Sequence, residues 1–389
     1  MGNESSQASG SYGEPVDNDI EVTWESVSAD YRFPLREGQC TCSHGNKMYI
    51  FGGVLQSDTE ILESNELHCF DIDTKTWSKV VVKGQIPPPR SAASLVSVGN
   101  KLLLFGGLSQ ECGWFDDVHI FDTEISTWQL LETEGRRPSP RDKLQAVAFP
   151  PFIYYFGGFG PKILPDDDSD DDGEEMDDEE VEVEEIQEQD GAEFVWFNDL
   201  FVLDTSTRKW SQPMQMNLGV PTARAAHAMC GVGRNLVIFG GRDTECRRND
   251  LHIFNIDTRK WDMHLTVKGR LPEPRSFHTA TAVGNRVVVM GGRGNNNEHF
   301  ADFHVFDTDT KEWLQPKVKG KFPTARGQHS AVTVGDYLVL FGGSGRFSPE
   351  TMQCHQFFSD TFILQTGDVL KGGSKPKPDG EKEENATRS

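Results

Sequence analysis

The sequence predicts an all-β protein that folds as a six-bladed β-propeller, closed by pairing of a strand near the N-terminus with the last blade. Three observations lead to this prediction. A short apolar strand ending in two glycines recurs six times, and five of these copies continue to a second strand and a tryptophan. The tryptophan that the sixth copy lacks is found near the other end of the chain. Repeats of this kind indicate an architecture of stacked, similar units.

The first observation is the strand that ends in two glycines. Its six copies end at Gly53, Gly107, Gly158, Gly241, Gly292 and Gly343. The intervals between them are 54, 51, 83, 51 and 51 residues, and the long interval contains a run of acidic residues. Glycine lets the chain turn sharply where a side chain would collide with a neighbouring blade, so we expect these glycines to be structural.

The second observation concerns the residues after each pair of glycines. In the first five copies an apolar strand ends in Asp or Asn and leads to a tryptophan, as in LHCFDIDTKTW and FHVFDTDTKEW. These tryptophans are Trp77, Trp128, Trp210, Trp261 and Trp313. Four strands in a unit of about 50 residues, with glycines and a tryptophan at these places, form the kelch signature of a propeller blade.

The third observation concerns closure of the ring. The sixth unit ends at Thr361-Phe-Ile-Leu-Gln365 without a tryptophan, whereas Glu21-Val-Thr-Trp24-Glu-Ser-Val27 reads as a strand without a unit. We expect these two segments to pair, because closure from both termini removes the open edges that promote aggregation.

The charge of the chain is concentrated in one segment. The formal net charge is −23, but residues 166–190 contain 17 acidic residues and no Lys or Arg, which leaves −6 for the rest. We expect residues 1–20 and 367–389 to be disordered flanks, 21–366 to form the propeller, and 166–190 to be a disordered insertion in blade three. Without a basic stripe, the sequence gives no indication of nucleic-acid binding.

Other features bear on compartment and cofactors. The chain has no run of 18 apolar residues and no secretory signal at its N-terminus. Its seven cysteines lack metal-ligand spacing, so we expect free thiols in a cytoplasmic or nuclear protein, with no metal or cofactor and no integral membrane association. The N-terminal Met-Gly-Asn-Glu-Ser-Ser pattern makes Gly2 a candidate for lipidation.

An arginine precedes the first strand of every unit, and we expect it to belong to the scaffold. In three units a histidine follows three residues later. The arginines are Arg36, Arg90, Arg141, Arg224, Arg275 and Arg326, and the histidines are His227, His278 and His329. Catalysis is not expected, because the sequence shows no nucleophile elbow, phosphate loop or metal-binding helix.

A candidate binding site lies where the repeat is broken. The loop after each diglycine and the loop entering each first strand open on the same face, and only two blades carry arginine directly after the diglycine, Arg242 and Arg293. The predicted site comprises four polar residues, Arg242, Arg247, Ser276 and Lys143, and an aromatic wall of Phe159, Trp196, Phe197 and Phe277. Such a set suits the carboxylate of an extended peptide. The alternative is that Arg242 and Arg247 are solvated or paired with Asp243, Glu245 or Asp250.

The spacing Gly-Gly-Arg242, Arg247, Asn249-Asp250, with Arg275-Ser276-Phe277-His278 downstream, resembles the kelch-domain substrate receptors of Cullin-RING ubiquitin ligases that bind C-terminal diglycine degrons. The resemblance covers residues 22–365 and implies that Arg242, Arg247 and Ser276 hold a free peptide C-terminus, with Lys143 and the aromatic residues nearby. The helical box by which such receptors bind an adaptor is not recognisable in residues 367–389. A kelch scaffold for a folded cytoskeletal or nuclear partner, without a C-terminal-peptide pocket, stays open as the alternative function.

Overall fold

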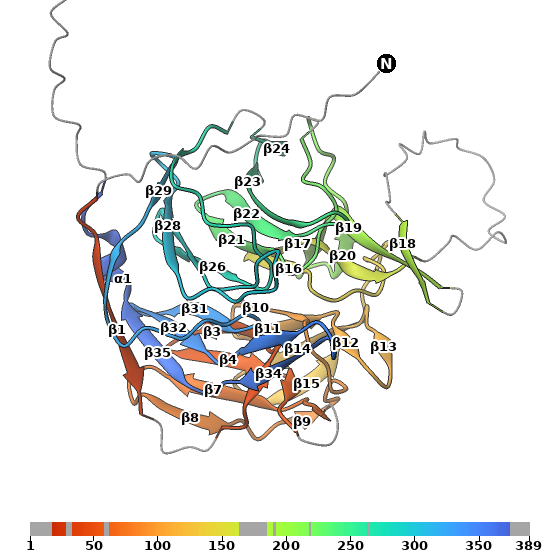
Figure 1. The fold of residues 1–389 in the computed structure, drawn as a ribbon. Coiled ribbons are helices and arrows are strands. Elements are labelled where there is room, and N and C mark those ends of the chain that lie inside the picture. Colours follow the sequence, from red (N-terminus) through yellow and green to blue (C-terminus); the bar gives the residue numbers. More distant parts are fainter. Residues whose placement is uncertain are drawn as a thin grey trace, which may run out of the picture.

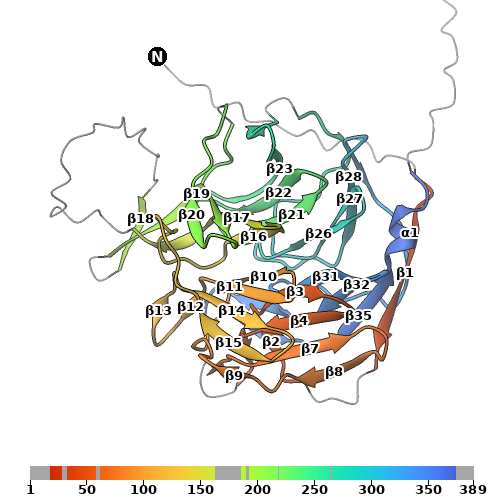
Figure 2. The same ribbon diagram turned by 180° about the vertical axis from the view of Figure 1, so that it is seen from behind.

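The computed structural model describes residues 18–28, 33–57, 62–162, 185–189, 192–217, 219–262 and 265–373. Six of the sheets in these residues, built mainly from antiparallel strands, are arranged as the blades of a propeller, as Figure 1 and the reverse view in Figure 2 show. The innermost strands of neighbouring blades contact one another in a closed circle, β3 to β10, β16, β21, β26, β31 and back to β3. The predicted kelch β-propeller is therefore confirmed.

The first three blades each contain four strands in sequence order from the centre outward. Blade one consists of β3 (Cys40–His44), β4 (Lys47–Phe51), β7 (Leu67–Asp71) and β8 (Thr76–Lys79). Blade two consists of β10 (Ser94–Val98), β11 (Lys101–Phe105), β14 (Val118–Asp122) and β15 (Thr127–Leu130), with β9 (Lys83–Gly84) parallel to β15. Blade three consists of β16 (Gln145–Phe149), β17 (Phe152–Pro161), β19 (Ala192–Asp204) and β20 (Lys209–Ser211), and β18 (Glu185–Gln189) pairs with β19.

Blades four and five have the same order, whereas the outermost strand of blade six is β1, from the start of the chain. Blade four consists of β21 (Ala228–Val232), β22 (Asn235–Arg242), β23 (Arg247–Asn255) and β24 (Lys260–Trp261). Blade five consists of β26 (Thr279–Val283), β27 (Arg286–Met290), β28 (Phe303–Asp307) and β29 (Glu312–Leu314), with β25 (Lys268–Gly269) parallel to β29. Blade six consists of β31 (Ser330–Val334), β32 (Tyr337–Phe341), β35 (Thr361–Gln365) and β1 (Glu21–Val27), with β30 (Lys317–Gly320) parallel to β1.

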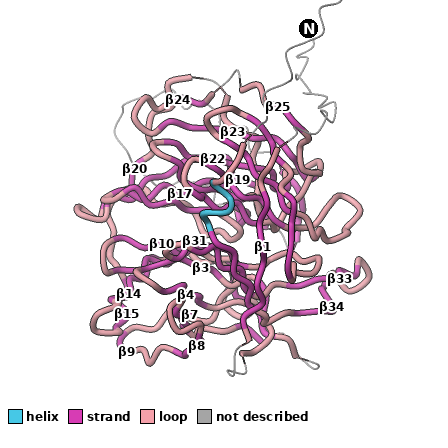
Figure 3. Tube along the Cα trace, turned by 90° about the vertical axis from the view of Figure 1, so that its left-hand side faces the viewer, coloured by secondary structure: helices cyan, strands magenta, loops and turns pink. Residues whose placement is uncertain are grey.

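Short strands extend the loops that connect the second and third strands of three blades, and in blade one also the segment that precedes the first strand. They are β2 (Arg36–Glu37), β5 (Val54–Leu55) and β6 (Leu62–Glu63) at blade one, β12 (Leu108–Ser109) and β13 (Gly113–Trp114) at blade two, and β33 (Ser344–Ser348) and β34 (Gln353–Phe357) at blade six. The β33–β34 hairpin projects from the body in Figure 3. A short helix, α1 (Thr366–Leu370), comes after the last strand and contacts β1, β26 and β35.

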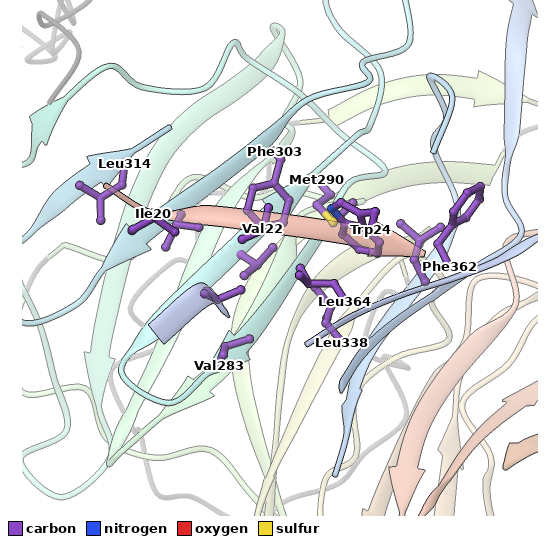
Figure 4. Close-up of a cluster of buried hydrophobic side chains, with 14 residues drawn as sticks. Ile20, Val22, Trp24, Val283, Met290, Phe303, Leu314, Leu338, Phe362 and Leu364 are labelled. Atoms are coloured by element: carbon purple, nitrogen blue, oxygen red, sulfur yellow. The ribbon is translucent and has the colours of Figure 1, made fainter. Parts of the chain in front are cut away.

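The strand β1 closes the ring by pairing with β35, as predicted. Trp24 pairs with Leu364 and Ser26 with Phe362 in the antiparallel ladder between β1 and β35. Trp24 is 1 % exposed and lies in a cluster that joins blades five and six, where Figure 4 shows it near Phe303 and Leu364. The first and last parts of the sequence therefore build one blade, as the missing tryptophan of the sixth unit predicted.

A ring of backbone hydrogen bonds joins all six blades. Two residues after each of the repeated arginines, an amide N–H donates to the carbonyl of the same position in the preceding blade. These positions are Gly38, Ala92, Lys143, Ala226, Phe277 and Gln328, and the N···O distances are 2.7–3.1 Å. The bond from the Gly38 amide to the Gln328 carbonyl connects blade one to blade six and completes the circle.

The glycines and tryptophans lock each blade to the next. Gly106 has a φ of +70°, and a Cβ there would lie 2.7 Å from the carbonyl oxygen of Arg141 in the following blade, so only glycine fits. In five blades the tryptophan ring packs against the phenylalanine that precedes the diglycine of the previous blade, as with Trp128 and Phe51 at 5.4 Å between centroids. At the closing interface Trp77 lies 4.6 Å from Phe341.

The structure corrects the predicted boundaries of the propeller. Ile20 is fully buried, although residues 1–20 were predicted to be disordered, and residues 1–17 lie outside the described part. The tail is ordered as far as residue 373, because the Arg286 guanidinium donates to the carbonyls of Val369 and Gly372 and the Val369 side chain is buried. Within the predicted disordered insertion, residues 185–189 form β18, while residues 166–184 and 190 lie outside the described residues.

Candidate functional site

The repeated arginines are scaffold, as predicted. Each is buried and donates a hydrogen bond to the carbonyl of the first glycine of its own blade's diglycine, as Arg90 does to Gly106 and Arg275 to Gly291. In five blades the guanidinium also forms an ion pair with an aspartate that lies in the third strand or just before it, such as Asp302 for Arg275. The same position in blade one is Glu66, 3.8 Å from Arg36.

The histidines that come after these arginines are also internal. Burial and the nearby Arg224 lower the pKa of His227 to about 3. Burial and Arg326 likewise lower the pKa of His329 to about 3. Both rings are therefore neutral at physiological pH; His227 packs against Phe156, and His329 forms a hydrogen bond with the Thr279 hydroxyl. Among the described residues, no cluster of three His, Cys, Asp or Glu side chains could hold a metal ion.

The two sets of loops that the sequence placed on one face do meet there. In every blade the residue after the repeated arginine pairs with the residue after the diglycine. The pairs are Glu37 with Val54, Ser91 with Leu108, Asp142 with Phe159, Ala225 with Arg242, Ser276 with Arg293, and Gly327 with Ser344. These twelve residues, which we call the rim, form one end of the propeller. Four of the eight predicted site residues lie in or beside the part of the rim that blades four and five contribute.

Arg242, Arg247 and Ser276 come together at the junction of blades four and five. Arg242 ends β22 and pairs directly with Arg247 at the start of β23. The Nε of Arg247 donates to the Oγ of Ser276 at 2.9 Å, and a terminal nitrogen of the same guanidinium donates to Asn297 at 3.2 Å. Ser276 is fully buried and Arg247 is 4 % exposed, whereas Arg242 is exposed.

Arg242 and Arg247 do not form the ion pairs with Asp243, Glu245 or Asp250 that the alternative interpretation predicted. Asp243 accepts from Arg248, and Asp250 accepts from the scaffold Arg224. Within the described part of the chain, no carboxylate lies within 4.0 Å of the guanidinium nitrogens of Arg242 or Arg247. Arg242 remains solvated, as the alternative proposed, but Arg247 is buried without a compensating anion.

The electrostatic environment of Arg247 is unusual for a guanidinium. Burial, together with the smaller effects of the positive charges of Arg293 and Arg242, lowers its pKa to about 10. The negative charge of Glu298 raises the pKa of Arg247, but this is the smallest of the effects. Burying a cation without an opposing charge costs free energy, because the charge loses its hydration. The site therefore favours an anion that would replace the missing partner.

Lys143 and the aromatic wall lie elsewhere on the same end of the propeller, in blade three. The Lys143 ammonium pairs with the buried Asp142 at 2.5 Å and lies 5.7 Å from the Phe159 ring, so its charge is already compensated. Phe159 contacts Trp196 at 4.8 Å between ring centroids. This cluster also includes Trp114 and Phe194, which are 4.9 Å apart and which the sequence did not single out.

Phe197 does not belong to this wall. The Arg141 guanidinium lies 3.7 Å above its ring, and the equivalent contact joins Arg90 to Phe115 in blade two at the same distance. Each of these phenylalanines stands two residues before the aspartate that pairs with the repeated arginine. That spacing would have identified Phe197 as scaffold, because it recurs in several blades.

Phe277 directly follows Ser276, and its backbone N–H donates to the Ala226 carbonyl of blade four within the ring of backbone hydrogen bonds. Its ring centre is 5.2 Å from the guanidinium carbon of Arg293, which also lies 3.8 Å above Phe347. The sequence identified Arg293 as an exception to the blade pattern but assigned it no role. The lipidation candidate Gly2 lies outside the described residues.

Comparison with known proteins places these features in a family. Residues 18–172 and 187–369 match the KLHDC2/KLHL20/DRC7 Kelch-repeats domain. Kelch domain-containing protein 1 of Mus musculus is 30 % identical over 321 residues, which cover 79 % of this chain and 75 % of the relative. Kelch domain-containing protein 2 of Bos taurus is 30 % identical over 300 residues, covering 74 % and 71 %, and Kelch domain-containing protein 3 of Rattus norvegicus is 28 % identical over 364 residues, covering 87 % and 86 %. Among the described residues, no helix is long and apolar enough to cross a membrane.

Proposed function

Because the chain belongs to the KLHDC2/KLHL20/DRC7 kelch-repeat family, we propose that it is a protein-binding propeller that captures the C-terminal peptide of a partner protein. The peptide's terminal carboxylate occupies the junction of blades four and five. There it accepts hydrogen bonds from Arg242 and Arg247. The protein binds its partner and performs no chemistry on it.

The observation that carries this proposal is the buried guanidinium of Arg247, which is held by Ser276 and Asn297 and has no carboxylate within ion-pair distance in the described residues. A guanidinium fork binds a carboxylate through two parallel charge-assisted hydrogen bonds, each about twice as strong as a neutral one. The exposed Arg242 beside it gives the incoming carboxylate a second donor. Both arginines are outside the repeated scaffold, so their side chains are available for recognition.

The residues upstream of the carboxylate can extend along the rim toward blade three. Phe159, Trp196 and Phe194 form an apolar surface there, and Trp114 continues it into blade two. An extended peptide would place alternate side chains against such a surface, which gives selectivity beyond the terminus.

The test compares one peptide in two forms. A dodecapeptide that binds the full chain is selected from a random library anchored through its N-terminus, so that every carboxyl terminus is free. We expect C-terminal amidation, Arg247→Ala and Arg242→Ala each to weaken binding by about 2–5 kcal/mol, because a desolvated carboxylate or guanidinium is left unpaired. That range corresponds to roughly 30-fold to 4,000-fold in Kd. Arg242→Lys should also weaken binding, since an ammonium cannot reproduce the planar fork.

Arg248→Ala is the matched control, because Arg248 neighbours Arg247 in the sequence but pairs with Asp243 and Glu245. Its effect on peptide affinity should be small. Equal affinity of the amidated and free peptides would refute the proposal, and so would a library that yields only binders indifferent to amidation. Either result would leave a scaffold that binds a folded partner as the better description.

A role as a substrate receptor, which the resemblance to ligase receptors implies, is a further step of the same proposal. It requires a Cullin-RING ligase to bind the chain at a separate surface. Co-purification of a cullin with the full chain, unchanged by Arg247→Ala, would support this step. Capture of the peptide-bearing partner without any cullin would contradict it.

A further inference from the structure

Arg293 occupies the position after the diglycine of blade five, next to the proposed carboxylate site. Its backbone N–H donates to the Ser276 carbonyl at 2.8 Å, and the Ser276 N–H donates to its carbonyl at 3.0 Å. The side chain of the same serine accepts from Arg247 at 2.9 Å. Ser276 therefore contacts both Arg247 and Arg293, and these contacts hold the two cations close together.

Two aromatic rings hold the Arg293 guanidinium. Its central carbon lies 3.8 Å from the centre of Phe347, on β33 of blade six, and 5.2 Å from the centre of Phe277. Its Nε is buried and has no hydrogen-bond partner among the described residues. Stacking on an aromatic ring orients a guanidinium while its N–H groups point outward in the plane, where an acceptor can approach.

Three arginines lie close together at this position, and among the described residues none of them forms an ion pair within 4.0 Å. Arg242, Arg247 and Arg293 interact as like charges, and burial together with these neighbours lowers the pKa of Arg247. The titratable groups of opposite sign that face them are the Cys354 thiol and Glu37 near Arg293, and Glu298 near Arg247. Neither glutamate lies within 4.0 Å of a guanidinium nitrogen of Arg293, and Glu37 instead accepts from Gln328 at 2.8 Å. A terminal carboxylate that accepts from Arg242 and Arg247 would still leave the Arg293 guanidinium, held between Phe277 and Phe347, without a carboxylate within ion-pair distance among the described residues.

We propose that Arg293 forms a second anion-binding subsite beside the terminal carboxylate, and that the preferred peptide carries Asp or Glu at one of its last two positions. This inference rests on the proposed function, because it concerns the same bound peptide. It differs from the diglycine terminus that the resemblance implies. A side-chain carboxylate within two residues of the terminus is the nearest group on a peptide that can supply the second charge.

The experiment varies the end of the peptide and the arginine together. Fluorescein-labelled dodecapeptide pools share ten randomised N-terminal positions and carry Glu, Gln, Asp, Asn or Gly at each of the last two positions, with a free or an amidated terminus. Fluorescence anisotropy with the full chain measures their Kd. We expect Glu or Asp to bind at least tenfold more tightly than Gln, Asn or Gly to the wild type, and this preference to vanish in Arg293→Gln.

Two further variants separate the subsite from general effects. Arg234→Gln removes the same charge at the opposite end of β22, where Arg234 is exposed and pairs with Asp257, and it should retain the preference. Arg293→Met keeps a long side chain between Phe277 and Phe347 and should lose the preference as Arg293→Gln does. Arg293→Met therefore tests the preference for acidic peptides if Arg293→Gln does not fold.

The outcomes distinguish this inference from the proposed function. If amidation weakens binding but Glu and Gln peptides bind alike, the second subsite is overturned while the C-terminal-peptide function stands. If Arg293→Gln weakens every peptide equally, Arg293 belongs to the terminal carboxylate site and the inference is again overturned. If amidation has no effect, the proposed function itself fails.

Discussion

Removal of the Trp24 side chain tests how the propeller is closed. Trp24 is 1 % exposed, lies 6.1 Å from Phe303 and 5.9 Å from Phe322 between ring centroids, and belongs to the strand that the N-terminal part of the chain contributes to blade six. Truncation of a buried tryptophan to alanine costs about 3–5 kcal/mol, because apolar contacts are lost and a cavity remains. We therefore expect Trp24→Ala to destabilise the whole propeller rather than one edge.

The expected change in melting temperature is set by the size of the ordered chain. An unfolding entropy of about 2.1 cal/mol/K per residue gives about 0.7 kcal/mol/K for the roughly 320 residues that the structure describes. Each kcal/mol then lowers Tm by about 1.5 °C, so Trp24→Ala should lower Tm by about 4–7 °C. Differential scanning calorimetry on the full chain measures this shift as a single transition.

Two controls and one truncation complete the test. Trp77→Ala removes the equivalent side chain of blade one and should have a similar effect, whereas Met214→Ala, at a side chain 73 % exposed, should change Tm by less than about 1 °C. Deletion of residues 1–17 should be neutral, while deletion of 1–28 removes β1 and should lower Tm more than Trp24→Ala. If Trp24→Ala has the Tm of the wild type while Trp77→Ala has a lower Tm, pairing of β1 with the last blade does not stabilise the propeller.

Two further predictions concern the scaffold. Arg90→Ala should lower the free energy of unfolding in urea by about 3–5 kcal/mol, because it removes the arginine partner of Asp117 and the side-chain donor to the Gly106 carbonyl. Peptide affinity of the fraction that folds should be unchanged, and a stable Arg90→Ala protein with lost binding would contradict its scaffold role. The free energy of unfolding should also decrease as the pH is lowered from about 6.5 to 3. His227 and His329 have pKa values of about 3 in the folded protein, whereas a histidine in the unfolded chain has an ordinary value near 6.5. At pH 5 the unfolded chain therefore binds protons that the folded protein does not, which stabilises the unfolded state by about 2 kcal/mol per histidine. Equal urea midpoints at pH 7.5 and pH 5 would show that these rings are not buried neutral.

The repeat made most of the fold predictable. Six similar units constrain one another, so the diglycines, the tryptophans and the pairing of Trp24 with the last blade could be predicted by counting. The end of the tail could not, because α1 is only five residues long and has no apolar period. It is held by one buried side chain, Val369, and by backbone carbonyls that accept from Arg286, and a sequence pattern does not record such contacts.

The composition of the site was less predictable than its position. The rim was placed correctly because strand direction alternates within a blade. The partners of Arg293 were not, because Phe277 lies two strands before it in the chain and Phe347 belongs to the next blade. Contacts between blades depend on the closed ring of backbone hydrogen bonds, which only the complete structure defines.

Which of two adjacent arginines faces the site depends on a single irregularity in the sheet. Side chains alternate along a strand, so Arg247 and Arg248 must point to opposite sides, one toward Ser276 and the other toward Asp243. The ladder between β22 and β23 shifts register between Phe239 and Gly241, at the diglycine. A register displaced by one residue would bury Arg248 in place of Arg247. The first glycine of the pair, which has a φ of +61° at Gly240, therefore sets both the blade packing and the identity of the buried guanidinium on which the proposed carboxylate site depends.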